Sequence, residues 1–359
     1  MSQIKKNMQE QESKTRLRES VKIRHYIMNL IYRHPNEKML IPGSNELAAM
    51  FGVGRATVTR VLKNLVEEGF LEGHRGIGTF TKIQNFIPVL GEMPPLVGLL
   101  AGDGKYFYYP YQVWSLMANS GLALTRNGCN VRTLSLTGPD EESLFAEISH
   151  QYLDGLVAVD MGPERAELIR RLHEEAGLKV ILQVNGDLDA STSGIDCFCF
   201  DFRKAGVEIG RRLIAEGRSK LHFIFLNPVT TFLLEGINSA YAAAGKKVDV
   251  TTYTWKGPEV FREISERLRK DVPDALYAHG EHYRTIRKLL NESGIDPIEQ
   301  CRLIAETHAI HSEYQGLCIE IPFEETGFAI GERIARHFRE NQLPAEHRKI
   351  PLTVYLKGI

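Results

Sequence analysis

The stretch "VGRATVTRVL" (residues 53–62) places two arginines and two threonines among regularly spaced apolar residues. A helix that begins at Arg55 and advances by about 100° per residue gathers the apolar side chains on one face. The opposite face is basic and hydroxylated, and the helix has no carboxylate before Glu67. The apolar face consists of Val58, Val61, Leu62 and Leu65, and the polar face of Thr59, Arg60, Lys63 and Asn64. We therefore expect the apolar face to pack in a core and the polar face to meet a partner.

The segments on either side of this helix predict two further helices and a β-hairpin. Apolar residues recur at helical spacing over 16–33, and a second short helix follows at 44–51 after a break at Pro35. The third helix begins at Arg55 and is expected to end at Gly69. Two short alternating segments then flank the glycine-rich turn "HRGIG". This order of elements is typical of a winged helix.

The rest of the chain has a different pattern. Residues 84–94 are aperiodic and contain prolines, and beyond them apolar strands alternate with helices for roughly 265 residues. Continuous apolar strands joined by helices are typical of parallel sheets with helices on both faces, and this length suffices for two doubly wound lobes. The sequence therefore predicts a multidomain protein. Its parts are an α+β winged helix-turn-helix domain at 14–83, a linker at 84–94 and a two-lobed α/β domain at 95–359.

Composition indicates a globular protein of the cytoplasm. Hydrophobic residues make up 43% and charged residues 25% of the chain. No apolar run approaches the roughly 20 residues that span a bilayer, and the polar start "MSQIKKNMQEQESKTRLRES" has no apolar core of a secretory signal. An odd, scattered set of five cysteines favours free thiols in a reducing compartment.

Charge is distributed unevenly along the chain. Residues 1–83 contain 14 Lys and Arg against eight Glu and no Asp, whereas 84–359 contain 30 basic and 37 acidic residues. A basic head on an acidic body indicates that the head, and not the body, meets a polyanion.

The segment 41–80 resembles the winged helix signature of GntR-type transcriptional regulators. Nearly every framework position of that signature is present, including the Pro42 turn, "ELA" at 46–48, "TV" at 57–58 and "GxGTF" at 76–80. Regulators of this family contact DNA through the start of the second helix, the recognition helix and the wing tip. The resemblance therefore implies DNA contacts by Ser44, Asn45, Arg55, Thr57, Thr59, His74, Arg75 and Gly76, and we add Arg60 from its place on the polar face of the helix. In a major groove, arginine can bond guanine and a threonine methyl can contact thymine.

The chain departs from this signature in three ways. Asn45 stands where the family often has arginine, and Gly43 removes the serine of a capping box with Glu46. Thr59 stands where an arginine often follows the Thr-Val pair, and Arg60 lies one step further round the helix. We therefore expect an operator sequence that differs from that of a typical family member.

The body resembles the periplasmic-binding-protein-like domain of lactose- and galactose-repressor proteins. The matching stretches include "VGLLAGD" (97–103), "LDGLVAV" (153–159) and "DFRKAGVEIGRRLIAEGRSKLHFI" (201–224). A GntR-type head on such a body resembles the architecture of arabinose repressors. The resemblance implies a small effector bound between two lobes, at the carboxyl ends of the strands.

Polar and aromatic residues that follow the predicted strands are the candidate effector ligands. They are Asp103, Tyr106, Phe107, Tyr108, Asp160, Asn185, Asp201, Asn227, His279 and Thr307. An aromatic wall with carboxylates and amides suits a sugar or another polar ring. The alternative for the tyrosine-rich stretch 105–111 is a lid or a dimer surface.

Three positions that usually bind sugar in such repressors differ here. Leu233 replaces an arginine, His279 and Gly280 replace an Asn-Asp pair, and Thr307 replaces an aspartate. Either the effector is not an ordinary monosaccharide or ligand sensing has been lost.

No constellation in the sequence indicates an enzyme. "ETHAIHSE" (306–313) and "HGEH" (279–282) lack a metal-site spacing, "GDG" (102–104) is no dinucleotide fingerprint, and Cys197 and Cys199 read as core residues of one strand. We therefore predict no catalytic residue, no metal and no cofactor. The sequence favours a homodimeric transcriptional repressor whose partners are an operator in double-stranded DNA and a small effector, with a carbohydrate as first candidate. A ligand-independent regulator with a degenerate sensor domain and a cytosolic solute-binding protein are the alternatives.

Overall fold

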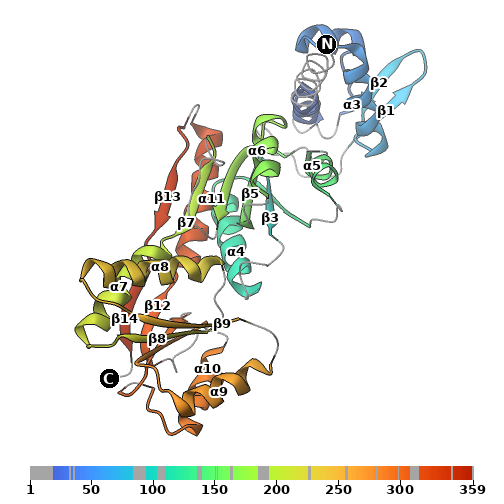
Figure 1. Ribbon diagram of the computed structural model, residues 1–359. Coiled ribbons are helices and arrows are strands. Elements are labelled where there is room, and N and C mark those ends of the chain that lie inside the picture. The colour runs from blue at the N-terminus through green and yellow to red at the C-terminus, as the bar shows by residue number, and fades with distance from the viewer. Residues whose placement is uncertain are drawn as a thin grey trace, which may run out of the picture.

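The computed structural model consists of three parts, namely a head, a first lobe (lobe 1) and a second lobe (lobe 2) (Figure 1). The structure describes residues 19–31, 34, 37–83, 94–102, 110–135, 140–149, 151, 153–161, 165–184, 194–224, 228–254, 258–279, 282–297, 299–307, 315–340 and 343–357. No helix in this described part is long and apolar enough to cross a membrane.

The head is a winged helix, as the sequence predicts. A first helix spans 19–31, and the hairpin strands pair antiparallel. Gly52 closes the second helix in the left-handed conformation at φ 65°, which a side chain would disfavour. Apolar side chains of all three helices and of the first hairpin strand share one core, which includes Ile27, Leu47 and Leu65. The labelled elements are α2 (Ser44–Phe51), α3 (Arg55–Glu67), β1 (Leu71–His74) and β2 (Gly78–Thr81).

Lobe 1 is built on a six-stranded parallel sheet with the order β13-β7-β6-β5-β3-β4. Its strands are β3 (Leu96–Ala101), β4 (Asn130–Leu134), β5 (Gly155–Met161), β6 (Lys179–Val184), β7 (Asp196–Phe200) and β13 (His347–Ile350). Two helices, α4 (Pro110–Arg126) and α11 (Phe323–Arg339), pack on one face. The other face is covered by α5 (Glu141–Ser149) and α6 (Ala166–Glu174).

Lobe 2 repeats this design on a second six-stranded sheet with the order β14-β12-β11-β10-β8-β9. The strands are parallel except for β14, which pairs antiparallel with β12. They are β8 (Lys220–Ile224), β9 (Asp249–Tyr253), β10 (Ala275–Ala278), β11 (Arg302–Thr307), β12 (Gly316–Glu320) and β14 (Thr353–Lys357). One face carries α7 (Phe202–Ala215) and α8 (Pro228–Ala243), and the other carries α9 (Val260–Lys270) and α10 (Tyr283–Glu292).

The described chain crosses between the lobes three times. It passes from β7 to α7, from β12 to α11 and from β13 to β14, so each lobe is assembled from separate stretches of sequence. Aromatic rings join the crossing segments, because the Phe200 ring lies edge-on to Phe202 at 6.5 Å and to Phe323 at 5.3 Å between centroids. These crossings form the hinge between the lobes.

Candidate functional site

The DNA-facing candidate is α3. Val58, Val61 and Leu65 are buried in the core of the head, and Arg55, Thr59, Arg60 and Lys63 are exposed. The predicted division into an apolar and a polar face is therefore confirmed. The helix begins without a side-chain cap at Gly54 and has no acidic residue in its first turn, which leaves its positive end available to an anion.

Contacts on the exposed face are few. The Thr59 hydroxyl donates to the carbonyl of Arg55 at 3.0 Å, and Arg60 donates weakly to the Ser20 hydroxyl at 3.4 Å. Lys63 lies 3.6 Å from Glu67. Within the described part of the chain, no hydrogen bond or ion pair engages the exposed guanidinium of Arg55. Arg55 can therefore meet a ligand without giving up an existing partner.

Thr57 differs from the other candidates on this helix. Its side chain is only 7% exposed, because Thr57 lies one turn before the buried Val61 and shares its packed face. The structure thus leaves Thr57 little surface for a base contact. At the start of α2, in contrast, Asn45 is exposed and Ser44 half-exposed.

The wing presents a basic tip beside an internally paired strand. Glu72 bonds both Lys38 and His74, whose Nε2 lies 3.1 Å from the carboxylate, and hydrogen bonds from these two side chains lower the pKa of Glu72 to about 2. Lys38 therefore neutralises the one acid of the wing. Gly76 turns the tip at φ 79°, and Arg75 is exposed next to it.

Only some of the candidate effector ligands lie among the described residues. Six of the candidates fall outside them, namely Asp103, Tyr106, Phe107, Tyr108, Asn185 and Asn227. Thr307 is the last residue of β11, and its side chain is likewise outside the description. The structure thus places Asp160, Asp201 and His279.

Asp160 lies near the carboxyl end of β5 in an unusual conformation. It is fully buried and has a φ of 57°, a backbone region that few residues other than glycine adopt. The pairing of β5 with β6 shifts at this point, and the Asp160 N–H donates to the Gln183 side chain at 2.9 Å. A Cβ on Gly102 would lie 2.0 Å from the Asp160 carbonyl oxygen, so the adjacent strand end requires glycine. Strain of this kind gathers at ligand sites.

His279 belongs to a buried polar cluster at the carboxyl ends of β10 and β11. Its Nε2 lies 3.3 Å from one oxygen of Glu306, and the Tyr277 hydroxyl donates to the other oxygen at 2.6 Å. Glu306 is 3% and His279 5% exposed. In the sequence, Glu306 stands out only as a possible metal ligand, and Tyr277 gives no signal. The signal for Glu306 was a carboxylate inside an apolar strand.

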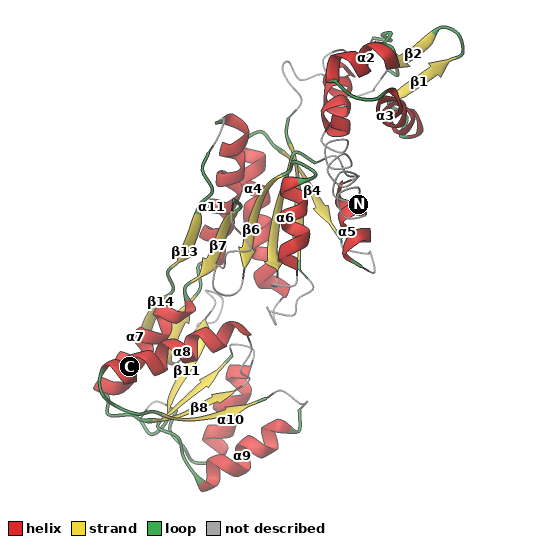
Figure 2. Cartoon of the chain, turned by 45° about the horizontal axis from the view of Figure 1, so that its top comes forward, coloured by secondary structure: helices red, strands yellow, loops and turns green. Residues whose placement is uncertain are grey.

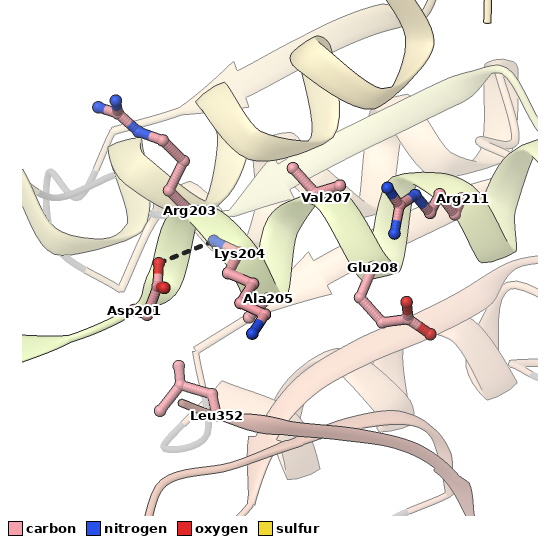
Figure 3. A pocket seen from close by; sticks show the side chains of 8 residues that line it. All are labelled: Asp201, Arg203, Lys204, Ala205, Val207, Glu208, Arg211 and Leu352. Atoms are coloured by element: carbon pink, nitrogen blue, oxygen red, sulfur yellow. Dashed lines mark hydrogen bonds between the residues drawn. The ribbon is translucent and has the colours of Figure 1, made fainter. Parts of the chain in front are cut away.

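Asp201 lies between β7 and α7, where the chain first crosses from lobe 1 to lobe 2. Its carboxylate accepts a hydrogen bond from the Lys204 N–H at 3.0 Å and so caps α7. Asp201 borders a cavity of about 500 Å³ that runs along α7 to Leu352 (Figure 3). Neither Asp160 nor His279 lines this cavity, so the structure does not bring the three candidates together there.

Two further observations concern metal-binding groups and cysteine thiols among the described residues. No group of three or more His, Cys, Asp or Glu side chains within them could hold a metal ion. All five cysteines are free and buried, as predicted for Cys197 and Cys199. Burial raises the pKa of Cys301 to about 12 and that of Cys318 to about 11, which keeps these thiols protonated and unreactive.

Comparison with family models divides the chain as its fold does. Residues 20–81 match bacterial regulatory proteins of the gntR family, and residues 110–283 match the periplasmic binding proteins and sugar binding domain of the LacI family. No sequence relative was found among curated proteins.

Similar solved structures are transcriptional regulators. A complex of the transcriptional regulator CelR with cellobiose is 17% identical and covers 88% of this chain and 99% of its own, with a TM-score of 0.59. A LacI family regulator from Enterococcus faecium with bound ribose is 15% identical, with 72% and 96% covered and a TM-score of 0.58. The lac repressor dimer bound to operator and the anti-inducer ONPF is 14% identical, with 76% and 98% covered and a TM-score of 0.60. At these identities the likeness is one of fold.

Proposed function

The chain joins a GntR-type helix-turn-helix domain to a LacI-type periplasmic-binding-like domain, and on this premise we propose that it is a DNA-binding transcriptional repressor controlled by a small effector. The observation that carries the proposal is the exposed, basic face of α3, which has no carboxylate before Glu67, within a folded winged helix. The regulator works in the cytoplasm, where its operator lies and where free thiols such as its five buried cysteines persist.

The proposed DNA contacts are those predicted from the sequence, without Thr57. The first turn of α3 enters the major groove, where Arg55 bonds a guanine and Thr59 offers its methyl group to a thymine. The Ser44 and Asn45 end of α2 meets the phosphate backbone, and the wing tip lies over an adjacent groove. The contact set is Ser44, Asn45, Arg55, Thr59, Arg60, His74, Arg75 and Gly76.

The proposed effector is a small polar molecule of the sugar class, bound between the lobes. Two of the similar regulators are described with sugars, cellobiose and ribose. Asp160 on lobe 1 and His279 on lobe 2 stand at carboxyl strand ends, where such folds bind ligands. The remaining proposed ligands are Asp103, Tyr106, Phe107, Tyr108, Asn185, Asp201, Asn227 and Thr307.

The proposed mechanism couples lobe closure to the two heads of a homodimer. Two heads read the half-sites of a pseudo-palindrome, so their spacing must match the helical repeat of DNA. Trp114 and Leu122 are exposed apolar side chains about two turns apart on α4 and support a dimer contact there. An effector that prefers one lobe arrangement shifts the head spacing and thereby the affinity for DNA.

The test is binding to DNA from around the protein's own gene, measured by fluorescence anisotropy over a range of salt concentrations. We expect sequence-preferring binding that weakens steeply with salt, because phosphate contacts release counterions. Arg55→Ala should weaken specific binding by about 1–3 kcal/mol, because a bidentate base contact is lost. Arg269→Ala, which removes an equal charge from the exposed surface of α9 in lobe 2, is the matched control and should bind as the parent does.

Two outcomes would count against the proposal. Binding that shows no sequence preference at any salt concentration would favour the solute-binding alternative. An unchanged affinity of the Arg55 variant would remove Arg55 from the interface.

A further inference from the structure

The head and lobe 1 meet across a cavity of about 640 Å³. From the head, the cavity is lined by Arg24, His25 and Met28 of the first helix together with Phe70. From lobe 1 it is lined by residues at the start of the strands, such as Leu96. The head therefore sits on the amino-terminal edge of the lobe 1 sheet, at the opposite end from Asp160.

One ion pair joins the two parts across this junction. His25 Nε2 lies 2.9 Å from one oxygen of Asp154, and the two side chains are 31% and 16% exposed. The second oxygen of Asp154 accepts a hydrogen bond from the Leu96 N–H at 2.7 Å. Backbone bonds tie Asp154 to Leu96 again and to Lys179, so three strands of the sheet hold this carboxylate in place.

The partner of Asp154 belongs to the packed first helix of the head. His25 lies between Ile23 and Ile27, which are both fully buried in the core of the head. Because the carboxylate belongs to lobe 1 and the imidazole to the head, their contact connects the two parts.

We propose that the winged helix domain docks on lobe 1 through an ion pair between protonated His25 and Asp154, and that loss of this proton releases the head. Docking itself requires no DNA. Its use in regulation, as the route by which lobe 1 positions the DNA-reading face, rests on the proposed function.

The surrounding charges favour this behaviour. The described charges near His25 are Asp154, the Arg24–Glu68 pair and Arg132. Hydrogen bonding and attraction to Asp154 raise the pKa of His25 above its ordinary value of 6.5, against the opposing effects of burial and of Arg24. Glu68 neutralises Arg24 at 2.5 Å, and Arg132 donates to Gln151 at 2.8 Å. A raised histidine pKa means that the pair is complete at low pH and is lost as pH rises through that value.

The docked head keeps its reading surface free. Both views place the wing of β1 and β2 on the far side of the head from lobe 1 (Figures 1 and 2). The junction uses the first helix and the chain just after α3, whereas Arg55 and Thr59 stay exposed. In addition, β5 links the two ends of lobe 1, because Asp154 precedes it and Asp160 lies near its end. A displacement of β5 at Asp160 would therefore reach the junction.

The test measures the distance between head and lobe 1 in the full-length protein without DNA or effector. Spin labels are attached to Met50→Cys on α2 and Thr133→Cys on β4, both exposed, while the five native cysteines are buried. An excess of unlabelled protein isolates the distance within one chain. We expect one narrow distance distribution at about pH 6 and a docked fraction lower by roughly three- to tenfold at about pH 8.5.

Three variants make the test specific. His25→Gln should give the broad distribution at both pH values, and His25→Lys, which keeps a positive charge, should give the narrow one at both. His34→Gln alters another histidine of the head, next to Glu37, and should behave as the parent. Melting followed by circular dichroism confirms that each variant is folded. An identical distribution at both pH values in the parent, or parent-like behaviour of His25→Gln, would overturn the proposal whether or not the protein binds DNA.

Discussion

Asp160 is held in a strained backbone conformation near the carboxyl end of β5. A fully buried residue with a φ of 57° costs free energy relative to glycine, so the neighbouring chain must hold it in place. The Gln183 side chain accepts a hydrogen bond from the Asp160 N–H, and Gly102 leaves room for the Asp160 carbonyl oxygen. These two contacts fix the conformation of the strand end.

At this scale we predict that Gly102→Ala destabilises the fold by about 2 kcal/mol or more. The added Cβ would lie 2.0 Å from the Asp160 carbonyl oxygen, which is a backbone atom that cannot move alone. Gly43→Ala is the matched control, because nothing lies within 4 Å of a Cβ there and its φ of −65° suits any residue. Urea denaturation gives the two free energies of unfolding. Equal stabilities of the two variants would show that the strand end tolerates a shift.

At the scale of elements, regular periodicity made the helices and strands predictable. The apolar stripe of α3 indicates which face of the helix is buried, and the continuous apolar runs indicate that the parallel strands are buried on both faces. Contacts that depend on register were not predictable. Glu306 meets His279 because β10 and β11 pair in parallel with Tyr277 opposite Ile304, and the His25–Asp154 contact joins parts that are distant in sequence. Asp201 directly follows β7, as the sequence indicates, but its second role as the cap of α7 was not predicted.

Lobe 2 should be the part of the molecule that is sensitive to acid. Burial lowers the pKa of His222 and of His282 to about 4, from an ordinary value of 6.5. Because the unfolded chain takes up these protons first, stability is complete above about pH 6.5 and is lost as pH falls toward 4. The protection factors against hydrogen exchange, which correct for the slower intrinsic exchange at low pH, should therefore fall in β8 and α10 at pH 5 relative to pH 7.5, before they fall in the head. His222→Phe should reduce this loss of protection; a variant with the full pH response would contradict the assignment.

For the whole molecule, the hinge and the two lobes predict reciprocal linkage. Sugars and related metabolites can be screened by thermal shift, because a ligand that binds only the folded state raises the melting temperature. For an effector found in this way, the factor by which it weakens operator binding must equal the factor by which operator weakens effector binding. Anisotropy and calorimetry measure the two factors. A ligand that stabilises the protein and leaves operator affinity unchanged would favour the degenerate-sensor alternative.

The three crossings between the lobes also determine the order in which the parts of the protein can fold during synthesis. Lobe 1 lacks its edge strand until β13 has been synthesised, because His347 pairs with Cys197 across a long stretch of chain. Lobe 2 waits in the same way for β14, the last strand that the structure describes. Neither lobe can complete its sheet while the chain is growing, whereas the head has all of its elements in the first part of the sequence. The winged helix should thus fold well ahead of the domain that is proposed to govern it, and nascent chains would carry a finished DNA-reading surface without a finished sensor.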